Sequence, residues 1–124
     1  MKKLLLLLVF IPSLAFAQIA PVAPTISSGF GTGAAIGTGG TSSAFTIGIG
    51  TGGTATNGVI GFQTAAPHGW ICFCDDQTTI STTVFRCRGT PTSTTTATLT
   101  NYSTSGTASA WVASDTIQGS CYPN

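Results

Sequence analysis

The sequence predicts an all-β domain, an antiparallel β-sandwich or jelly roll, that follows a cleaved N-terminal signal helix. Beyond residue 17 the chain has no Lys, no Glu and no Met and only one Leu, so strong helix formers are scarce. Thr and other β-branched residues are abundant there, and they favour strands. Short apolar runs from Phe45 to Tyr122 are separated by glycine-rich turn clusters, the pattern typical of sandwiches.

Residues 1–17 have the three parts of a secretory signal peptide. Lys2 and Lys3 give a positive start, Leu4–Phe10 is apolar, and an Ala-x-Ala pattern ends at Ala17. We expect cleavage after Ala17 and export to the periplasm or the outside. The alternative is an uncleaved anchor, but this apolar core of about a dozen residues is shorter than the roughly 20 that span a bilayer.

Cleavage leaves a nearly uncharged chain. Its two Arg and three Asp give a formal net charge of −1. Nucleic acids and anionic membranes are recognised by clustered Lys and Arg, so we expect neither as a partner, and no stable membrane anchor. The length indicates a single domain, residues 25–124, after a flexible Pro/Ala-rich lead-in at residues 18–24.

Alternating apolar and polar residues define the strands of this domain. The expected strands, in chain order, are Pro24–Ser27, Ala44–Ile49, Gly58–Phe62, Gly69–Cys74, Thr82–Arg88, Thr94–Tyr102, Ala110–Val112 and Ile117–Tyr122. In the fourth strand, Trp70, Cys72 and Cys74 share one face. Ile71 and Phe73 share the other face. In the fifth strand, Cys87 faces opposite to Arg86 and Arg88.

The glycine-rich stretch Ser28–Thr41 resembles a dinucleotide-binding loop only superficially. Such a loop needs a helix after its glycines, and Ala35–Gly40 contains too much glycine to form one. No acidic residue follows at the distance that ribose binding requires. We expect turns with positive φ at glycine instead. Ile36–Thr41 recurs letter for letter as Ile49–Thr54, which predicts two similar loops at the ends of neighbouring strands.

The four cysteines, in an exported chain, predict two disulfides. Cys72 and Cys74 lie two apart on one strand face and are poorly placed to bond each other. Of the two remaining pairings we favour Cys74–Cys87 across a hairpin, with Cys72–Cys121 joining the central strand to the last one. A zinc site is the alternative, since C-x-C with two further cysteines is a possible ligand set.

Catalysis has little support in the sequence. His68 is the only histidine, and no G-x-S-x-G motif marks a nucleophile. Asp75 and Asp76 are adjacent, and neighbouring strand residues point to opposite faces. Calcium binding by this pair is an alternative that lacks further acidic ligands. We expect no enzyme activity, no catalytic residue, no cofactor and no metal.

Aromatic residues are the better lead to a function. Trp70 is expected in the core, beside Cys72. Trp111 follows a loop, and we expect it to be partly exposed. Trp111 and Tyr102 are our candidate ligand-binding residues, because exposed aromatic rings bind sugars in many secreted modules, although a core or subunit-interface Trp is the commoner case.

The order of motifs resembles phage-encoded β-domains at the C-terminal ends of tail fibres and related virion proteins. The glycine-rich part "SSGFGTGAAIGTGG" is followed by "APHGWICFC", "TTVFRCR", "TTTATLTNY" and "GSCY". The resemblance covers Thr25 to Tyr122. It implies a β-sandwich, often trimeric, that serves adhesion or structure, and it implies that the W-x-C strand and the late S-C belong to a bridged pair.

Two functions follow as expectations. The first is a secreted structural or adhesion domain, phage- or prophage-encoded, virion-associated, fibre-like and homo-oligomeric as a trimer. The second is a secreted module that binds carbohydrate or another component of a cell surface, with a host glycan or protein as its partner. They differ in whether Trp111 and Tyr102 are buried between subunits or form an exposed strip.

Overall fold

A computed structural model describes residues 22–52, 55–78 and 86–124 of the chain. The described residues are all-β and form strands that pair only in the antiparallel sense, which confirms the predicted fold class. The strands are β1 Thr25–Ser28, β2 Ala35–Ile36, β3 Phe45–Gly48, β4 Asn57–Gly61, β5 Trp70–Asp76, β6 Arg86–Pro91, β7 Thr96–Tyr102 and β8 Thr116–Pro123.

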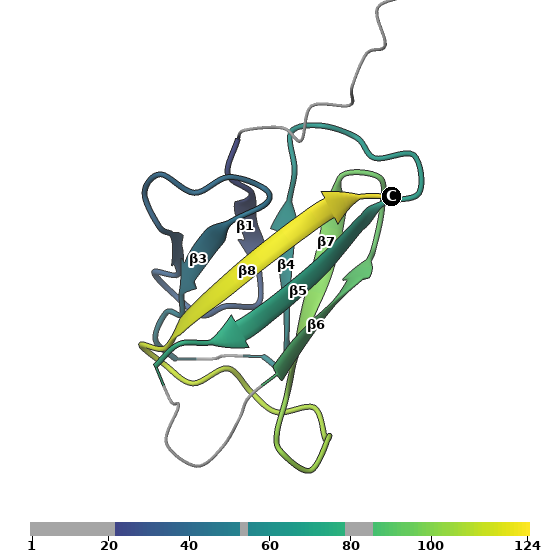
Figure 1. The fold of residues 1–124 in the computed structure, drawn as a ribbon. Helices are drawn as coiled ribbons and strands as arrows, with labels where there is room; N and C mark the ends of the chain where they lie inside the picture. The colour runs from purple at the N-terminus through teal and green to yellow at the C-terminus, as the bar shows by residue number, and fades with distance from the viewer. Residues whose placement is uncertain (1–21, 53–54, 79–85) are drawn as a thin grey trace, which may run out of the picture.

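The eight strands found in the described residues belong to one hydrogen-bonded sheet. Their order is β1-β4-β7-β6-β5-β8-β3-β2, and the edge strands β1 and β2 contact each other, so the sheet curls into a nearly closed barrel-like shape. In Figure 1, β8 and β5 lie side by side across the front. A curled sheet of this kind turns one face of each strand toward the core.

Backbone hydrogen bonds join the glycine-rich segment between β1 and β2 to the residues that follow β3. The backbone N–H groups of Thr32 and Thr51 each donate to the other's carbonyl at 3.0 Å, and Gly50 N–H donates to Phe30 O at 2.9 Å. A Cβ on Gly50 would lie 2.7 Å from the Thr32 carbonyl carbon, so only glycine permits this approach. The glycine-rich stretch therefore connects the two edge strands, β1 and β2, and Gly29, Gly31 and Gly33 have the expected positive φ.

The two Ile-Gly-Thr-Gly-Gly-Thr copies lie at different positions in the fold. The first begins at the end of β2 and leads into the turn before β3, where Gly37 N–H donates to Thr46 O at 2.9 Å. The second follows β3, where Ile49 N–H donates to Asp115 O at 2.8 Å. The copies follow neighbouring strands, as predicted, but those strands are antiparallel, so the loops lie at opposite ends of β3.

The core is built from the inward face of each strand. In β5, Trp70, Cys72 and Cys74 are buried while Ile71 and Phe73 are exposed, as the alternation predicted. All four cysteines form disulfides, with the favoured pairing of Cys72–Cys121 and Cys74–Cys87. Disulfides persist in oxidising compartments, so the protein belongs outside the cytoplasm.

Two aromatic pairs fill the core at the two ends of β4. Phe62, just after β4, stacks on Trp70 with ring centroids 4.0 Å apart. At the other end, the Phe30 and Trp111 rings lie 5.3 Å apart, and the backbone N–H of Trp111 donates to Ala55 O. Trp111 is 2% exposed, so the expectation of a partly exposed Trp111 is wrong. The segment expected to be a strand at residues 110–112 is instead a loop that turns its indole inward.

The expected signal peptide, residues 1–17, lies outside the described residues. Of the lead-in at residues 18–24, the structure describes residues 22–24, and Pro24 is already buried. In the described part of the chain no apolar helix reaches the length needed to cross a membrane.

Candidate functional site

The outward side of β5 and β8 carries exposed apolar side chains in neighbouring positions. Ile71 pairs with Tyr122 and Phe73 pairs with Ser120 across the two strands. Phe73 is 62% exposed, Tyr122 45% and Ile71 37%. Single exposed apolar residues are ordinary, but a contiguous group is typical of a binding surface.

This surface also has a polar border. Asp75 pairs with Gln118 in the next row of the same two strands, and both side chains are exposed. We call the surface the outer β5–β8 face and define it by six residues, which are Ile71, Phe73, Asp75, Gln118, Ser120 and Tyr122. Successive rows are about 6.7 Å apart along the strands.

Disulfides fix the central strand of this face on both sides of Phe73. Cys72 is bonded to Cys121 of β8, and Cys74 is bonded to Cys87 of β6. Both bonds join residues that are directly paired in the sheet. Phe73 stands between them and points outward. The most exposed aromatic ring on the face is therefore held by a strand with covalent links to both neighbours, which limits the entropy lost when a ligand binds.

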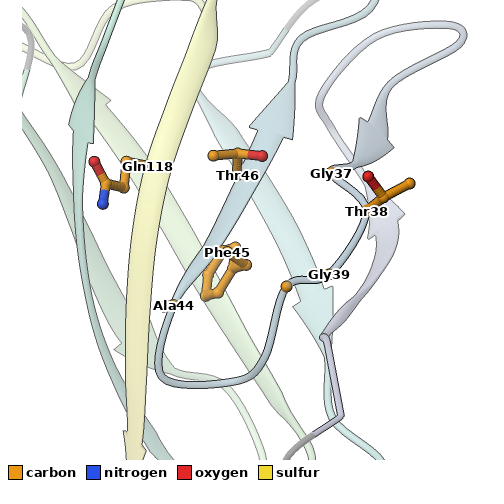
Figure 2. Close-up of a pocket in the computed structure, with 8 residues that line it drawn as sticks. Gly37, Thr38, Gly39, Ala44, Phe45, Thr46 and Gln118 are labelled. Carbon is orange, nitrogen blue, oxygen red and sulfur yellow. The ribbon is translucent and has the colours of Figure 1, made fainter.

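Two shallow depressions adjoin the outer β5–β8 face. One, of about 270 Å³, lies between Ser43 and Ala44 on one side and Phe73 and Asp75 on the other. The second, of about 220 Å³, lies between β3 and the first Gly-Thr loop. Figure 2 shows this second depression, with Gly37, Thr38 and Gly39 on the loop and Thr46 on β3. Gln118 and Ala44 line both depressions, so the two lie next to each other.

The face is close to electrically neutral. Asp75 is its one acidic residue, and the exposed Arg88 of β6 pairs with Phe73 from the other side. The remaining polar groups near the depressions are hydroxyls and one amide, from Thr38, Ser43, Thr46, Gln118 and Ser120. Such groups donate and accept hydrogen bonds without selecting for ligand charge.

The structure does not bring the two sequence-predicted ligand residues together. Trp111 is buried in the core, so it offers no exposed platform. Tyr102 is half-buried at the end of β7 and pairs with Arg86, which in turn pairs with Asp75. Tyr102 therefore lies two strands from Asp75, about 10 Å away. Ligand binding by Tyr102 stays a prediction.

Among the described residues, His68 lies far from the carboxylates at the end of β5. His68 is an exposed loop residue before β5, whereas Asp75 lies near the end of that strand, roughly 20 Å along it. Asp76 accepts a hydrogen bond at 2.8 Å from Thr78 N–H, two residues on, as an Asp in a turn often does. Within the described ranges no three His, Cys, Asp or Glu residues are placed to hold a metal ion.

Sequence reasoning assigned Ile71 and Phe73 to the correct strand face but did not single them out as site residues. The Cys-Phe-Cys sequence at residues 72–74 nevertheless indicates which way Phe73 points. Cysteines bonded to neighbouring strands face the core, so the Phe73 between them must point to solvent. Gln118 and Ser120 gave no such signal, because only the pairing of β8 with β5 places them beside Phe73.

Comparison with protein-family models finds no matching family, and comparisons with curated proteins and with solved structures find no similar protein.

Proposed function

We propose that this protein is an exported, non-enzymatic adhesion domain that attaches to a cell surface through the outer β5–β8 face. Residues 1–17 act as its signal peptide. The observation that carries the proposal is the exposed Phe73 between two disulfide-bonded cysteines. An exposed aromatic ring contributes nothing to the core, and the disulfides hold its strand rigid. Binding surfaces combine these properties: an apolar anchor and a preorganised support.

The test is binding of labelled, disulfide-bonded protein, residues 18–124, to intact cells of the encoding host and of related strains. We expect saturable binding that falls at least about 10-fold in Phe73→Ala. Val112→Ala is the matched control, because Val112 is 45% exposed and lies in the loop before β8. Equal binding by Phe73→Ala and the unaltered protein, or no binding to any cell type, would contradict the proposal.

We also propose that the domain is phage- or prophage-encoded and fibre-like, on the strength of the motif order from Thr25 to Tyr122. Mass spectrometry of purified virions and of culture supernatant tests this. Enrichment in virions supports a virion component, whereas its presence in the supernatant alone contradicts it. The associated homo-oligomer is tested by analytical ultracentrifugation, where a monomer mass at all concentrations counts against a trimer.

A further inference from the structure

We propose that the outer β5–β8 face binds a neutral oligosaccharide, with Phe73 as the ring on which a sugar stacks and with Gln118 and Asp75 bonding to its hydroxyls. This inference rests on the proposed adhesion function and names the ligand class of that same site.

The chemistry of the face matches the two sides of a sugar ring. A pyranose presents polarised C–H bonds on its flat face, and the face of an aromatic ring is electron-rich. Its edge carries hydroxyls that both donate and accept. The Asp75 carboxylate accepts, whereas the Gln118 amide and the Ser120 hydroxyl do both. Asp75 and Gln118 lie one row from Phe73, about 6.7 Å away, a spacing comparable with the width of one sugar ring.

A charged ligand fits this face poorly. Phosphate, sulfate and carboxylate groups are recognised by clustered Arg and Lys. Among the described side chains, the cation paired directly with Phe73 is Arg88, and Asp75 is one row away on β5. Arg86 is the residue of β6 that pairs with Asp75, so two Arg and one Asp leave a single net positive charge beside Phe73. One net charge is less than the cluster of cations that an acidic glycan requires, so a neutral ligand is favoured.

A second copy of the chain also fits poorly. An aromatic side chain buries about 200 Å² when covered, so at their observed exposures Phe73, Tyr122 and Ile71 offer roughly 300 Å² of apolar surface. A stable protein interface buries about 800 Å² on each partner. The apolar area suits one or two sugar rings and falls well short of a subunit contact.

The paired depressions extend the site beyond one sugar. They run from Phe73 past Ala44 and Gln118 to Thr38 on the first Gly-Thr loop. Each volume, about 270 and 220 Å³, is below the range of a drug-sized ligand pocket, roughly 300–1,000 Å³. Together they accommodate a chain of two or more units, so longer oligosaccharides should bind more tightly than the corresponding monosaccharide.

The experiment applies the disulfide-bonded protein to immobilised neutral and acidic oligosaccharides, followed by calorimetry with the best-bound compound. We expect binding to neutral oligosaccharides, a loss of at least about 10-fold in Phe73→Ala and retention in Phe73→Trp, which keeps a stacking ring. Gln118→Ala should also weaken binding, and Val112→Ala should not. Near-UV circular dichroism confirms that each variant is folded.

The outcomes separate this inference from the adhesion function. Cell binding that depends on Phe73, without binding to any neutral oligosaccharide, overturns the saccharide inference and leaves adhesion standing. Binding to acidic oligosaccharides alone also overturns it. Self-association that Phe73→Ala abolishes identifies a second copy as the occupant and overturns it too. If the unaltered protein binds to no cells, the proposed adhesion function is itself overturned.

Discussion

Single residues show most clearly what alternation alone can and cannot predict. Phe73 and Trp111 are both large aromatic residues in apolar stretches of the sequence, yet one is exposed and the other buried. The exposure of Phe73 could be predicted, because strand alternation around two cysteines sets the direction of its side chain. Trp111 was not, because a loop has no fixed period, and its burial depends on contacts with Phe30 and Ala55, which are distant in sequence.

Burial of both tryptophans gives a prediction for fluorescence. Trp70 and Trp111 are each at most 2% exposed, so native emission should be blue-shifted and acrylamide should quench it weakly. Unfolding should shift the emission to the red and raise the quenching. The Trp111→Phe variant reports on Trp70 alone, and its emission and quenching should match those of the unaltered protein. A readily quenched component that disappears in this variant would mean that Trp111 is exposed.

A pair of strand glycines tests the packing of the core. A Cβ on Gly119 would lie 2.6 Å from ring carbons of Phe45, whereas one on Gly48 would meet only Ala35 O at 3.8 Å. Gly119→Ala should therefore lower the free energy of unfolding by about 1–3 kcal/mol. Gly48→Ala, the control, should change it by less than about 0.5 kcal/mol. Urea denaturation measures both, and equal effects would contradict this packing.

At the scale of elements, the sequence predicted the positions of the long strands but not those of the short ones. The alternation in β5 and β8 is strict, and both were predicted to within two residues. The two-residue β2 was missed, because it depends on pairing with Ile47 and Gly48. The start of the strand expected at Thr82–Arg88 lies outside the described residues, and its later part forms β6.

The two disulfides should contribute unequally to stability. Cys72–Cys121 spans 49 residues and Cys74–Cys87 spans 13. In the chain-entropy model these loops correspond to about 4 and about 3 kcal/mol. The double variant Cys72→Ala/Cys121→Ala should therefore unfold at lower denaturant than Cys74→Ala/Cys87→Ala. Because Cys72 and Cys121 are also fully buried, their removal leaves a cavity that widens the difference. The opposite order of unfolding for the two double variants would contradict the predicted contributions.

At the scale of the whole molecule, the closed sheet could not be read from the sequence. A sandwich and a curled single sheet share the same alternation, and only the pairing and contacts of strands distinguish them. Here the edge strands β1 and β2 contact each other, and the glycine-rich residues 29–34 connect them. Such glycine-rich residues carry no periodic signal that would indicate this contact.

The β2 edge should be the weakest part of the sheet. Two residue pairs join β2 to β3, and one isolated bridge between Thr32 and Thr51 extends that pairing, whereas β5 and β8 pair over seven residues and share a disulfide. Hydrogen exchange in native conditions should show fast exchange for the Thr32 and Thr51 amides and slow exchange along β5 and β8. Uniform protection of both regions would mean that the fold opens only as one unit.

Ligand recognition by the outer β5–β8 face is tested most directly by a map of amide chemical shifts. Isotope-labelled, disulfide-bonded protein is titrated with oligosaccharides released from the cells that it binds. Amide shifts should be concentrated at residues 71–75 and 118–122, with further shifts in the first Gly-Thr loop. Shifts confined to the opposite end of β5, at the depression lined by His68, Pro91 and Thr94, would contradict it.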